Sequence, residues 1–395
     1  MSPVPVRRLR VLHVLPDLRV GTQHFVFTLA QHVDSEQFQF LVACLEDLDN
    51  REAGPGGANI EVIPLHHQPG RRGVLTFMKL VRLIHEQRVD VVHTHSFLDR
   101  LFAHPAALVS RIPVVHTLNM VYERAHDFRE RKSLRDRILL WIRHSLRRRL
   151  ELLAVKRYIA ISQAVYDSYA PVVPDAPNRL ALVYYGVPTE RLGRAPEEEA
   201  LLRLRTDLHL EAAYPILINV ARLAIAQKDQ LTLLRALSIL RRRFPDTRLL
   251  LVGEGKDRSA IELEIESSGL VEAASLLGSR QDIGTLMALS DIFVFPSRYE
   301  GFGIAVAEAM AAGKPVVASM VAPLTELIQE GVSGYLAEPG NPEAFASAVA
   351  KLAASRALAE SMGREGQRLA REKFDIGRCA QGWEQVYRTA VEEKG

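Results

Sequence analysis

The sequence has few cysteines and no long apolar run, and both shortages exclude whole classes of protein. Its 395 residues include only two cysteines, Cys44 and Cys379, so we expect buried thiols and neither a disulfide framework nor a cysteine metal site. The apolar run from Val11 to Leu15 is too short for a signal peptide, and no other run reaches membrane-spanning length. These features predict a cytoplasmic protein, or one held at a cytoplasmic membrane surface.

The sequence also lacks a large net charge. Fifty Lys and Arg against 47 Asp and Glu give a formal charge of +3, which is too small to predict a nucleic-acid partner. Residues 129–149 depart from this balance, because they are rich in Arg and carry an apolar arc around Trp141. A basic amphipathic helix in peripheral contact with an anionic membrane has this pattern. A solvated helix with a core-facing stripe explains it equally well, so both interpretations stay open.

Apolar runs typical of buried strands alternate with helical patterns along the chain. Runs of Val, Ile and Leu without polar alternation favour α/β domains with parallel sheets that are covered on both faces. We expect strands at residues 9–15, 40–45, 60–65, 89–94, 114–117, 157–161 and 179–183, and then at 215–220, 248–252, 274–277, 292–295 and 315–318. Between the two series, residues 186–200 have the composition of a linker. The pattern predicts two doubly wound domains that face a cleft, with ligands at the carboxyl ends of strands.

Residues 291–319 contain the strongest indication of function. A predicted strand ends in Pro and Ser, and a loop with two glycines then leads into an Ala-rich helix that starts near Gly303. The first N–H groups of a helix have no intrahelical partner and form a natural anion site. Glu300 and Glu308 would repel a phosphate there, so we expect them to accept hydrogen bonds from hydroxyl groups. Phosphate and hydroxyls together indicate a nucleotide sugar.

This segment resembles the signature of glycosyltransferase family 4, the glycosyl transferases of group 1, which are retaining enzymes that use nucleotide sugars. The resemblance rests on two Glu eight residues apart, preceded by strand, Pro and Ser and followed by Ala-x-Gly-x-Pro-Val-Val-Ala. It implies the GT-B fold, with two doubly wound Rossmann-like domains facing a cleft. It also implies that the donor sugar is held by Glu300 and by the backbone of Gly301, Phe302, Gly303 and Ile304, and the ribose by Glu308.

Other residues of the second domain match the same family pattern. Arg222 and Lys228 follow its first predicted strand, where two cations suit a pyrophosphate, and the family contacts the donor diphosphate with such a pair. The resemblance also implies that the backbone at Gly253 passes near the nucleotide and that Arg280 lies near the base. The Gly-x-Gly that begins at Gly253 is weak evidence for a dinucleotide, because Arg258 stands where the third glycine is expected.

The first domain matches the family less closely. Gly21 ends the first strand-to-helix loop and is assigned to the donor site, but a second glycine and an acid that the family usually shows are missing. Among three histidines at predicted strand ends, His116 resembles the residue that lies beside the donor sugar. His93 and His95 suggest a metal by their spacing, yet no further ligand clusters near them in sequence and the family needs no metal. We therefore expect no metal site.

The resemblance also covers the joint between the domains and the tail. Tyr185 replaces an Asn and Pro188 an Asp at the usual interdomain strand end, so we expect the hydrogen bonds of those side chains to be lost. The last helix resembles one that crosses back onto the first domain, although a simple packing helix fits equally. We expect an N-terminal domain at residues 1–185, completed by a crossing helix at about 377–395, and a nucleotide-sugar domain at residues 186–376.

The resulting prediction is retaining, metal-independent transfer of a sugar from a UDP- or GDP-sugar to a hydroxyl of a glycan, lipid-linked or small-molecule acceptor, without a cofactor. We assign the catalytic roles to His116, Arg222, Lys228 and Glu300, and no dedicated nucleophile, because the leaving phosphate can take the proton. One alternative is a nucleotide-sugar epimerase on the same fold. The other is a catalytically degenerate homologue that binds a partner or a polysaccharide.

Overall fold

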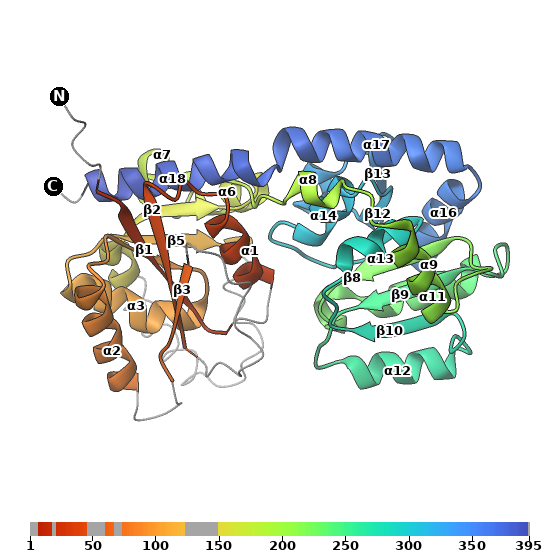
Figure 1. The fold of residues 1–395 in the computed structure, drawn as a ribbon, viewed down its shortest axis with the longest axis horizontal. Helices are drawn as coiled ribbons and strands as arrows, with labels where there is room; N and C mark the ends of the chain where they lie inside the picture. Colours follow the sequence, from red (N-terminus) through yellow and green to blue (C-terminus); the bar gives the residue numbers. More distant parts are fainter. Residues whose placement is uncertain (1–6, 18–20, 46–59, 67–72, 123–148, 394–395) are drawn as a thin grey trace. The chain divides into compact units, whose positions relative to one another are not determined.

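The computed structural model describes residues 7–17, 21–45, 60–66, 73–122 and 149–393 (Figure 1). The chain divides into two compact units, which are described separately. Unit 1 consists of residues 1–186 and 376–395, and unit 2 of residues 187–375. Each unit contains one sheet of parallel strands with helices packed against it, so the α/β fold class with two Rossmann-like domains is confirmed.

The sheet of unit 1 has seven strands in the order β3-β2-β1-β4-β5-β6-β7. They are β1 (Leu9–Leu15), β2 (Phe38–Cys44), β3 (Ile60–Pro64), β4 (Val91–Thr94), β5 (Val114–Leu118), β6 (Val155–Ala160) and β7 (Leu180–Leu182). The order reverses between β1 and β4, because the chain adds β2 and β3 on one side before it crosses to the other. In doubly wound sheets the carboxyl ends of strands at such a reversal border a crevice that suits a ligand.

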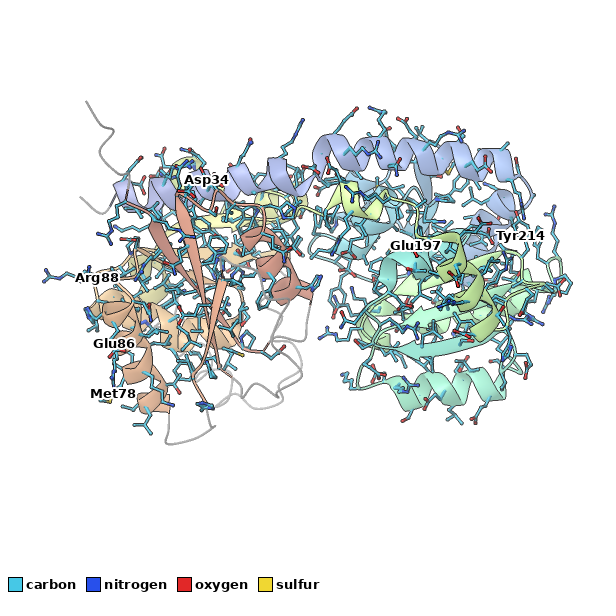
Figure 2. The ribbon with its side chains drawn as sticks, viewed as in Figure 1. Asp34, Met78, Glu86, Arg88, Glu197 and Tyr214 are labelled. Atoms are coloured by element: carbon cyan, nitrogen blue, oxygen red, sulfur yellow. The ribbon has the colours of Figure 1, made fainter. Side chains whose placement is uncertain are left out.

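The helices of unit 1 connect these strands, apart from the last. They are α1 (Gly21–Ala30), α2 (Gly73–Glu86), α3 (Phe97–Val109), α6 (Gln163–Tyr169), α7 (Ala176–Arg179) and α18 (Ile376–Glu392). Helix α18 buries Trp383 and Tyr387 completely, and the Trp383 indole stacks on the ring of Tyr185. In Figure 2, Asp34 lies beside α18, and its backbone N–H donates to Glu384 of that helix at 2.8 Å. These contacts fasten the C-terminal helix to the N-terminal part of the chain.

The sheet of unit 2 has six strands in the order β10-β9-β8-β11-β12-β13. They are β8 (Ile216–Val220), β9 (Arg248–Val252), β10 (Ala274–Gly278), β11 (Ile292–Phe295), β12 (Val316–Ser319) and β13 (Gly334–Ala337). Here the order reverses between β8 and β11, so the loops that follow these two strands emerge at the same edge of the sheet. The sequence did not predict β13, a four-residue strand at the end of the sheet.

Ten helices appear in the described part of unit 2. They are α8 (Thr189–Leu192), α9 (Glu198–Asp207), α10 (Ile225–Lys228), α11 (Gln230–Leu240), α12 (Arg258–Ser267), α13 (Ile283–Leu289), α14 (Ile304–Ala311), α15 (Leu324–Leu327), α16 (Pro342–Ala353) and α17 (Arg356–Lys373). The expectation that residues 186–200 form a linker was wrong, because α8 lies there and contacts α14 within unit 2. Both cysteines are buried, as expected.

None of the helices in the described ranges combines the length and the apolar character of a membrane-spanning segment. The basic segment at residues 129–149 falls outside the described residues except for Arg149. The two interpretations of that segment therefore both remain predictions from sequence.

Candidate active site

The loop between β11 and α14 brings a carboxylate and a helix N-terminus to one edge of the unit 2 sheet. Gly303 caps α14 with φ 99°, a left-handed conformation that glycine adopts without strain. A Cβ at this position would lie 2.6 Å from the Leu324 side chain, so the turn also needs the absence of a side chain. Glu300 precedes the turn and is buried, with 7% of its surface exposed. The local sequence thus fixes both the helix start and the position of the carboxylate.

Lys228 and Glu300 form an ion pair that joins residues 72 positions apart. Lys228 is the last residue of α10, which follows β8, and Glu300 follows β11. The two strands are neighbours in the sheet, so the loops that carry these residues meet at its edge. Both side chains are largely withdrawn from solvent, and the Lys228 ammonium lies 4.9 Å from the centre of the Phe295 ring. A poorly solvated charge pair of this kind can exchange partners with a ligand that carries both charge and hydroxyl groups.

Arg222 lies on the same loop system but has an exposed side chain. Its guanidinium donates to Gln227 Oε1 at 3.0 Å. The carbonyl of Gln227 in turn accepts from the backbone N–H of Arg298 at 2.8 Å, which ties the loop after β8 to the loop after β11. Asp229, beside Lys228, is buried and forms an ion pair with Arg298 at 3.0 Å. Arg222 and Lys228 therefore lie on a loop that hydrogen bonds and an ion pair hold against the loop after β11.

Glu308 projects from the second turn of α14 and is half-buried. Removal of the carboxyl group from water raises its pKa from 4.5 to about 7, and the positive charge of Arg191 on α8 opposes this shift. A glutamate in this state is partly protonated near neutral pH. It gains stabilisation as an anion when hydroxyl groups donate hydrogen bonds to it.

Gly253 and Gly255 allow two backbone segments of unit 2 to touch. A Cβ at Gly253 would lie 2.1 Å from the carbonyl oxygen of Ala221, and one at Gly255 would lie 2.1 Å from that of Leu223. The loop after β9 therefore lies directly against the loop that carries Arg222. Any other residue at either position would push the two loops apart.

Arg280 follows β10 and makes a bidentate ion pair with Asp282, with N···O distances of 2.8 and 2.6 Å. This hydrogen bonding lowers the pKa of the Asp282 carboxyl below its usual value, while partial burial acts in the opposite direction. The Arg280 guanidinium is thus held in one orientation at the strand end.

The remaining predicted site residues, Gly21 and His116, belong to unit 1. Gly21 is the first residue of α1, and the residues just before it lie outside the described ranges. His116 lies in β5 and is buried, with Nδ1 at 2.8 Å from the hydroxyl of Thr94. Burial lowers the pKa of His116 well below its usual value, with the charge of Arg100 acting in the same direction, so the imidazole is neutral. The other predicted residues all lie in unit 2.

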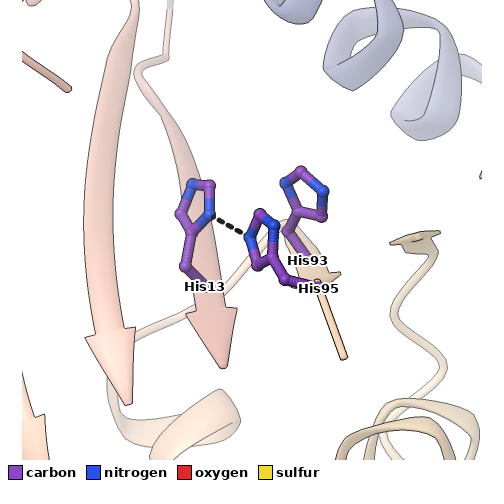
Figure 3. Close-up of side chains that lie close together, drawn as sticks. All are labelled: His13, His93 and His95. Carbon is purple, nitrogen blue, oxygen red and sulfur yellow. Dashed lines mark hydrogen bonds between the residues drawn. The ribbon is translucent and has the colours of Figure 1, made fainter. Parts of the chain in front are cut away.

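Two features of unit 1 bear on what the sequence indicated, and the second of them corrects it. The Tyr185 hydroxyl makes a hydrogen bond of its own, donating to Asn119 Oδ1 at 2.6 Å, and the predicted loss of the Asn and Asp hydrogen bonds stays a prediction. His93 and His95 do have a further potential ligand nearby, since His13 of β1 lies beside them (Figure 3). The signal in the sequence was a histidine in the middle of the apolar run Leu9–Leu15, where a polar residue needs a partner when it is buried.

Two parallel-sheet Rossmann-like units with this loop arrangement are typical of the GT-B fold, and comparison with known proteins identifies the family. The family model "Glycosyl transferases group 1" matches residues 203–369, and the model "Glycosyltransferase Family 4" matches residues 20–191. Together the two matches span most of both units. The chain belongs to this family and is a glycosyltransferase.

Individual relatives agree with this assignment. The UDP-Gal:alpha-D-GlcNAc-diphosphoundecaprenol alpha-1,3-galactosyltransferase of Escherichia coli is 24% identical over 365 residues, 89% of this chain and 89% of the relative. The GDP-mannose-dependent alpha-(1-6)-phosphatidylinositol monomannoside mannosyltransferase of Mycolicibacterium smegmatis is 31% identical over 198 residues, 48% of this chain and 51% of the relative. The crystal structure of HepE from Anabaena, in complex with UDP and glucose, superposes with a TM-score of 0.78 at 22% identity, covering 96% of this chain and 99% of that one. This likeness confirms the fold.

Proposed function

We propose that this glycosyltransferase transfers a sugar from a UDP- or GDP-sugar to a hydroxyl group of a glycan, lipid-linked or small-molecule acceptor, with retention of anomeric configuration and without a metal ion. The observation that carries the proposal is the Lys228–Glu300 ion pair beside the N-terminus of α14. It combines a cation, a carboxylate and outward-facing backbone amides, which are the groups needed to hold a phosphate next to a sugar hydroxyl.

The diphosphate is held by positive groups from two neighbouring loops. Lys228 acts as a point charge, and Arg222, whose side chain is exposed, can make bidentate contacts. The amides from Gly301 to Ile304 add partial positive charge. Together they stabilise the charge that develops on the leaving nucleotide diphosphate, which is the task that a bound metal ion performs in other transferases.

The sugar and the nucleoside are held by the remaining groups of unit 2. The donor's phosphate competes for Lys228, which releases Glu300 to accept hydrogen bonds from the sugar hydroxyls. Glu308 accepts hydrogen bonds from the ribose. The loop at Gly253 provides backbone close to the nucleotide, and Arg280, oriented by Asp282, lies near the base.

Unit 1 contributes the remaining donor contacts and the acceptor. His116, whose imidazole is neutral, and Gly21, the first residue of α1, are assigned contacts with the donor on the strength of the family resemblance. The acceptor hydroxyl attacks the anomeric carbon from the face that the diphosphate leaves, and the leaving phosphate takes the proton. Relatives that use UDP-Gal and GDP-mannose support a nucleotide sugar of one of these two kinds.

The proposal is tested by two conservative substitutions at the ion pair. Glu300→Gln and Lys228→Met should each lower the transfer rate about 100-fold or more. Lys228→Met removes a positive charge that stabilises the leaving diphosphate, and Glu300→Gln weakens the hydrogen bonds that position the sugar. The matched controls are Arg235→Met and Glu264→Gln. Each breaks an ion pair at 3.6 Å on the surface of the same unit and should keep full activity. Wild-type activity in either ion-pair variant would contradict the assignment.

Donor identity, retention and metal independence are tested separately. Thermal-shift measurements with UDP, GDP and ADP identify the nucleotide, since a ligand that binds the native state raises its stability. Transfer should persist in excess EDTA. The anomeric configuration of the product, measured by NMR, should match that of the donor, and an inverted product would refute retention.

A further inference from the structure

Three histidines of unit 1 gather on one face of its sheet at the point where the strand order reverses. His13 of β1 pairs in register with His93 of β4, so both side chains project from the same face. His95 follows two residues after His93 and points to that face as well (Figure 3). All three are buried, with at most 3% of their surface exposed. The residues proposed to bind the donor do not include them.

The spacing of their ring nitrogens suits a metal ion. One nitrogen from each ring lies within 4.8 Å of the other two, and His13 Nδ1 lies 3.0 Å from His95 Nε2. Nitrogen ligands at about 2.0–2.1 Å from a tetrahedral Zn²⁺ are roughly 3.3 Å apart. Modest rotations of the rings would therefore bring three lone pairs to a common point.

The protein groups that the structure describes do not satisfy the hydrogen-bonding capacity of this cluster. His13 and His95 use one nitrogen each in the bond that joins them, and within the described residues His13 Nε2 and His95 Nδ1 have no hydrogen-bond partner. Buried polar atoms without partners are rare, and a bound ion or water is one explanation for them. Burial also favours the neutral imidazole, which is the form that ligates a metal.

The surroundings offer the supporting contacts of a metal site. His93 has hydroxyl partners on both nitrogens, Tyr387 at 2.9 Å and Thr117 at 2.7 Å. When one nitrogen binds an ion, the hydroxyl at the other can accept its N–H and fix the ring. The carboxyl group of Asp99, which is also buried, accepts the backbone N–H of His95 at 2.7 Å and can offset part of the positive charge.

We propose that His13, His93 and His95 form a buried site for one divalent transition-metal ion, with Zn²⁺ as the fitting example. The ion joins β1 to β4 and stabilises unit 1. Thr94, which lies between two of the ligands, contacts His116, so the ion also steadies the strand that holds this residue in place. It takes no part in the proposed transfer reaction, so this site and the metal-independent mechanism can fail independently.

The test uses the full-length chain refolded with Zn²⁺, because a buried site fills slowly from outside. After a weak chelator has removed loosely held ions, elemental analysis should find one Zn²⁺ per chain. The ion should raise the melting temperature by about 3 °C or more relative to metal-free protein. Co²⁺ in place of Zn²⁺ should give the visible absorption of a nitrogen-ligated site.

Two variants separate a metal site from a hydrogen-bond network. His13→Asn and His95→Gln place an amide near the nitrogen that each histidine uses in their mutual bond, so a mere network would tolerate them. Both should lose the retained Zn²⁺ and the shift in melting temperature, whereas His85→Gln, at an exposed histidine of α2, should keep both. Wild-type protein that retains no Zn²⁺, or variants that retain as much as wild type, would overturn the proposal.

Discussion

Replacement of Glu308 by Gln should stabilise unit 2 at alkaline pH. The folded protein raises the pKa of this carboxyl from 4.5 to about 7, mainly because α14 and its neighbours remove it from water. Each pKa unit corresponds to about 1.4 kcal/mol, so the free energy needed to ionise Glu308 in the folded state is about 3 kcal/mol. This is an upper limit, because the side chain keeps some contact with solvent.

The sign of the effect follows from proton binding. Between pH 4.5 and 7 the folded state binds more protons at Glu308 than the unfolded state, so the contribution of this residue to stability falls as the pH rises through that window. Gln cannot ionise and shows no such loss. The variant should therefore be up to about 3 kcal/mol more stable than wild type at pH 8, and the difference should vanish near pH 4.

The measurement is urea unfolding followed by far-ultraviolet circular dichroism from pH 4 to pH 9. Tryptophan fluorescence is unsuitable, because both tryptophans, Trp141 and Trp383, fall in the sequence of unit 1 and Glu308 falls in unit 2. Glu266→Gln, at an exposed glutamate of α12, is the control and should follow wild type at every pH. A constant difference between the Glu308 variant and wild type across the pH range would refute the reasoning.

A nucleotide adds a second readout. If the ribose hydroxyls donate to the Glu308 carboxylate, the bound ligand stabilises the anion. The affinity of wild type for its nucleotide should then rise as the pH increases through 7, whereas that of the Gln variant should stay flat. An equal pH dependence in both proteins would remove Glu308 from the ribose site and leave its pKa shift unaffected.

Two further substitutions test the packing that supports the site. Gly255→Ala places a Cβ 2.1 Å from the Leu223 carbonyl oxygen and should lower the unfolding free energy of unit 2 by about 3 kcal/mol. Urea unfolding followed by circular dichroism measures this free energy. An unchanged unfolding midpoint would show that the two loops can separate without cost. Trp383→Ala removes a fully buried side chain from α18 and should destabilise unit 1 by about 3–5 kcal/mol in the same assay. Glu392→Ala, at an exposed residue of the same helix, is the control. Equal stability of the two variants would contradict the role of this helix in fastening the C-terminus to unit 1.

The strands were largely predictable because their signal is local. Continuous runs of Val, Ile and Leu mark strands that are buried on both faces, and the structure contains a strand in every predicted run. The missed strand β13 begins with a glycine and spans four residues, too few for a pattern to emerge. The short helix α8 was hidden in the same way, because Pro and Gly around residues 188–193 have the composition of a loop.

The sequence by itself determined the two series of strands, the helix start at Gly303 and the cations and carboxylates near it, because each depends on residues close together in the chain. Only the tertiary structure decided which of these groups meet. Lys228 reaches Glu300 because β8 lies beside β11, and His13 reaches His93 because β1 lies beside β4. Strand order arises from packing of the whole sheet, so no local pattern of residues reveals it. The strand order therefore decides that Lys228 and Glu300 form an ion pair and that His13 joins the histidine cluster.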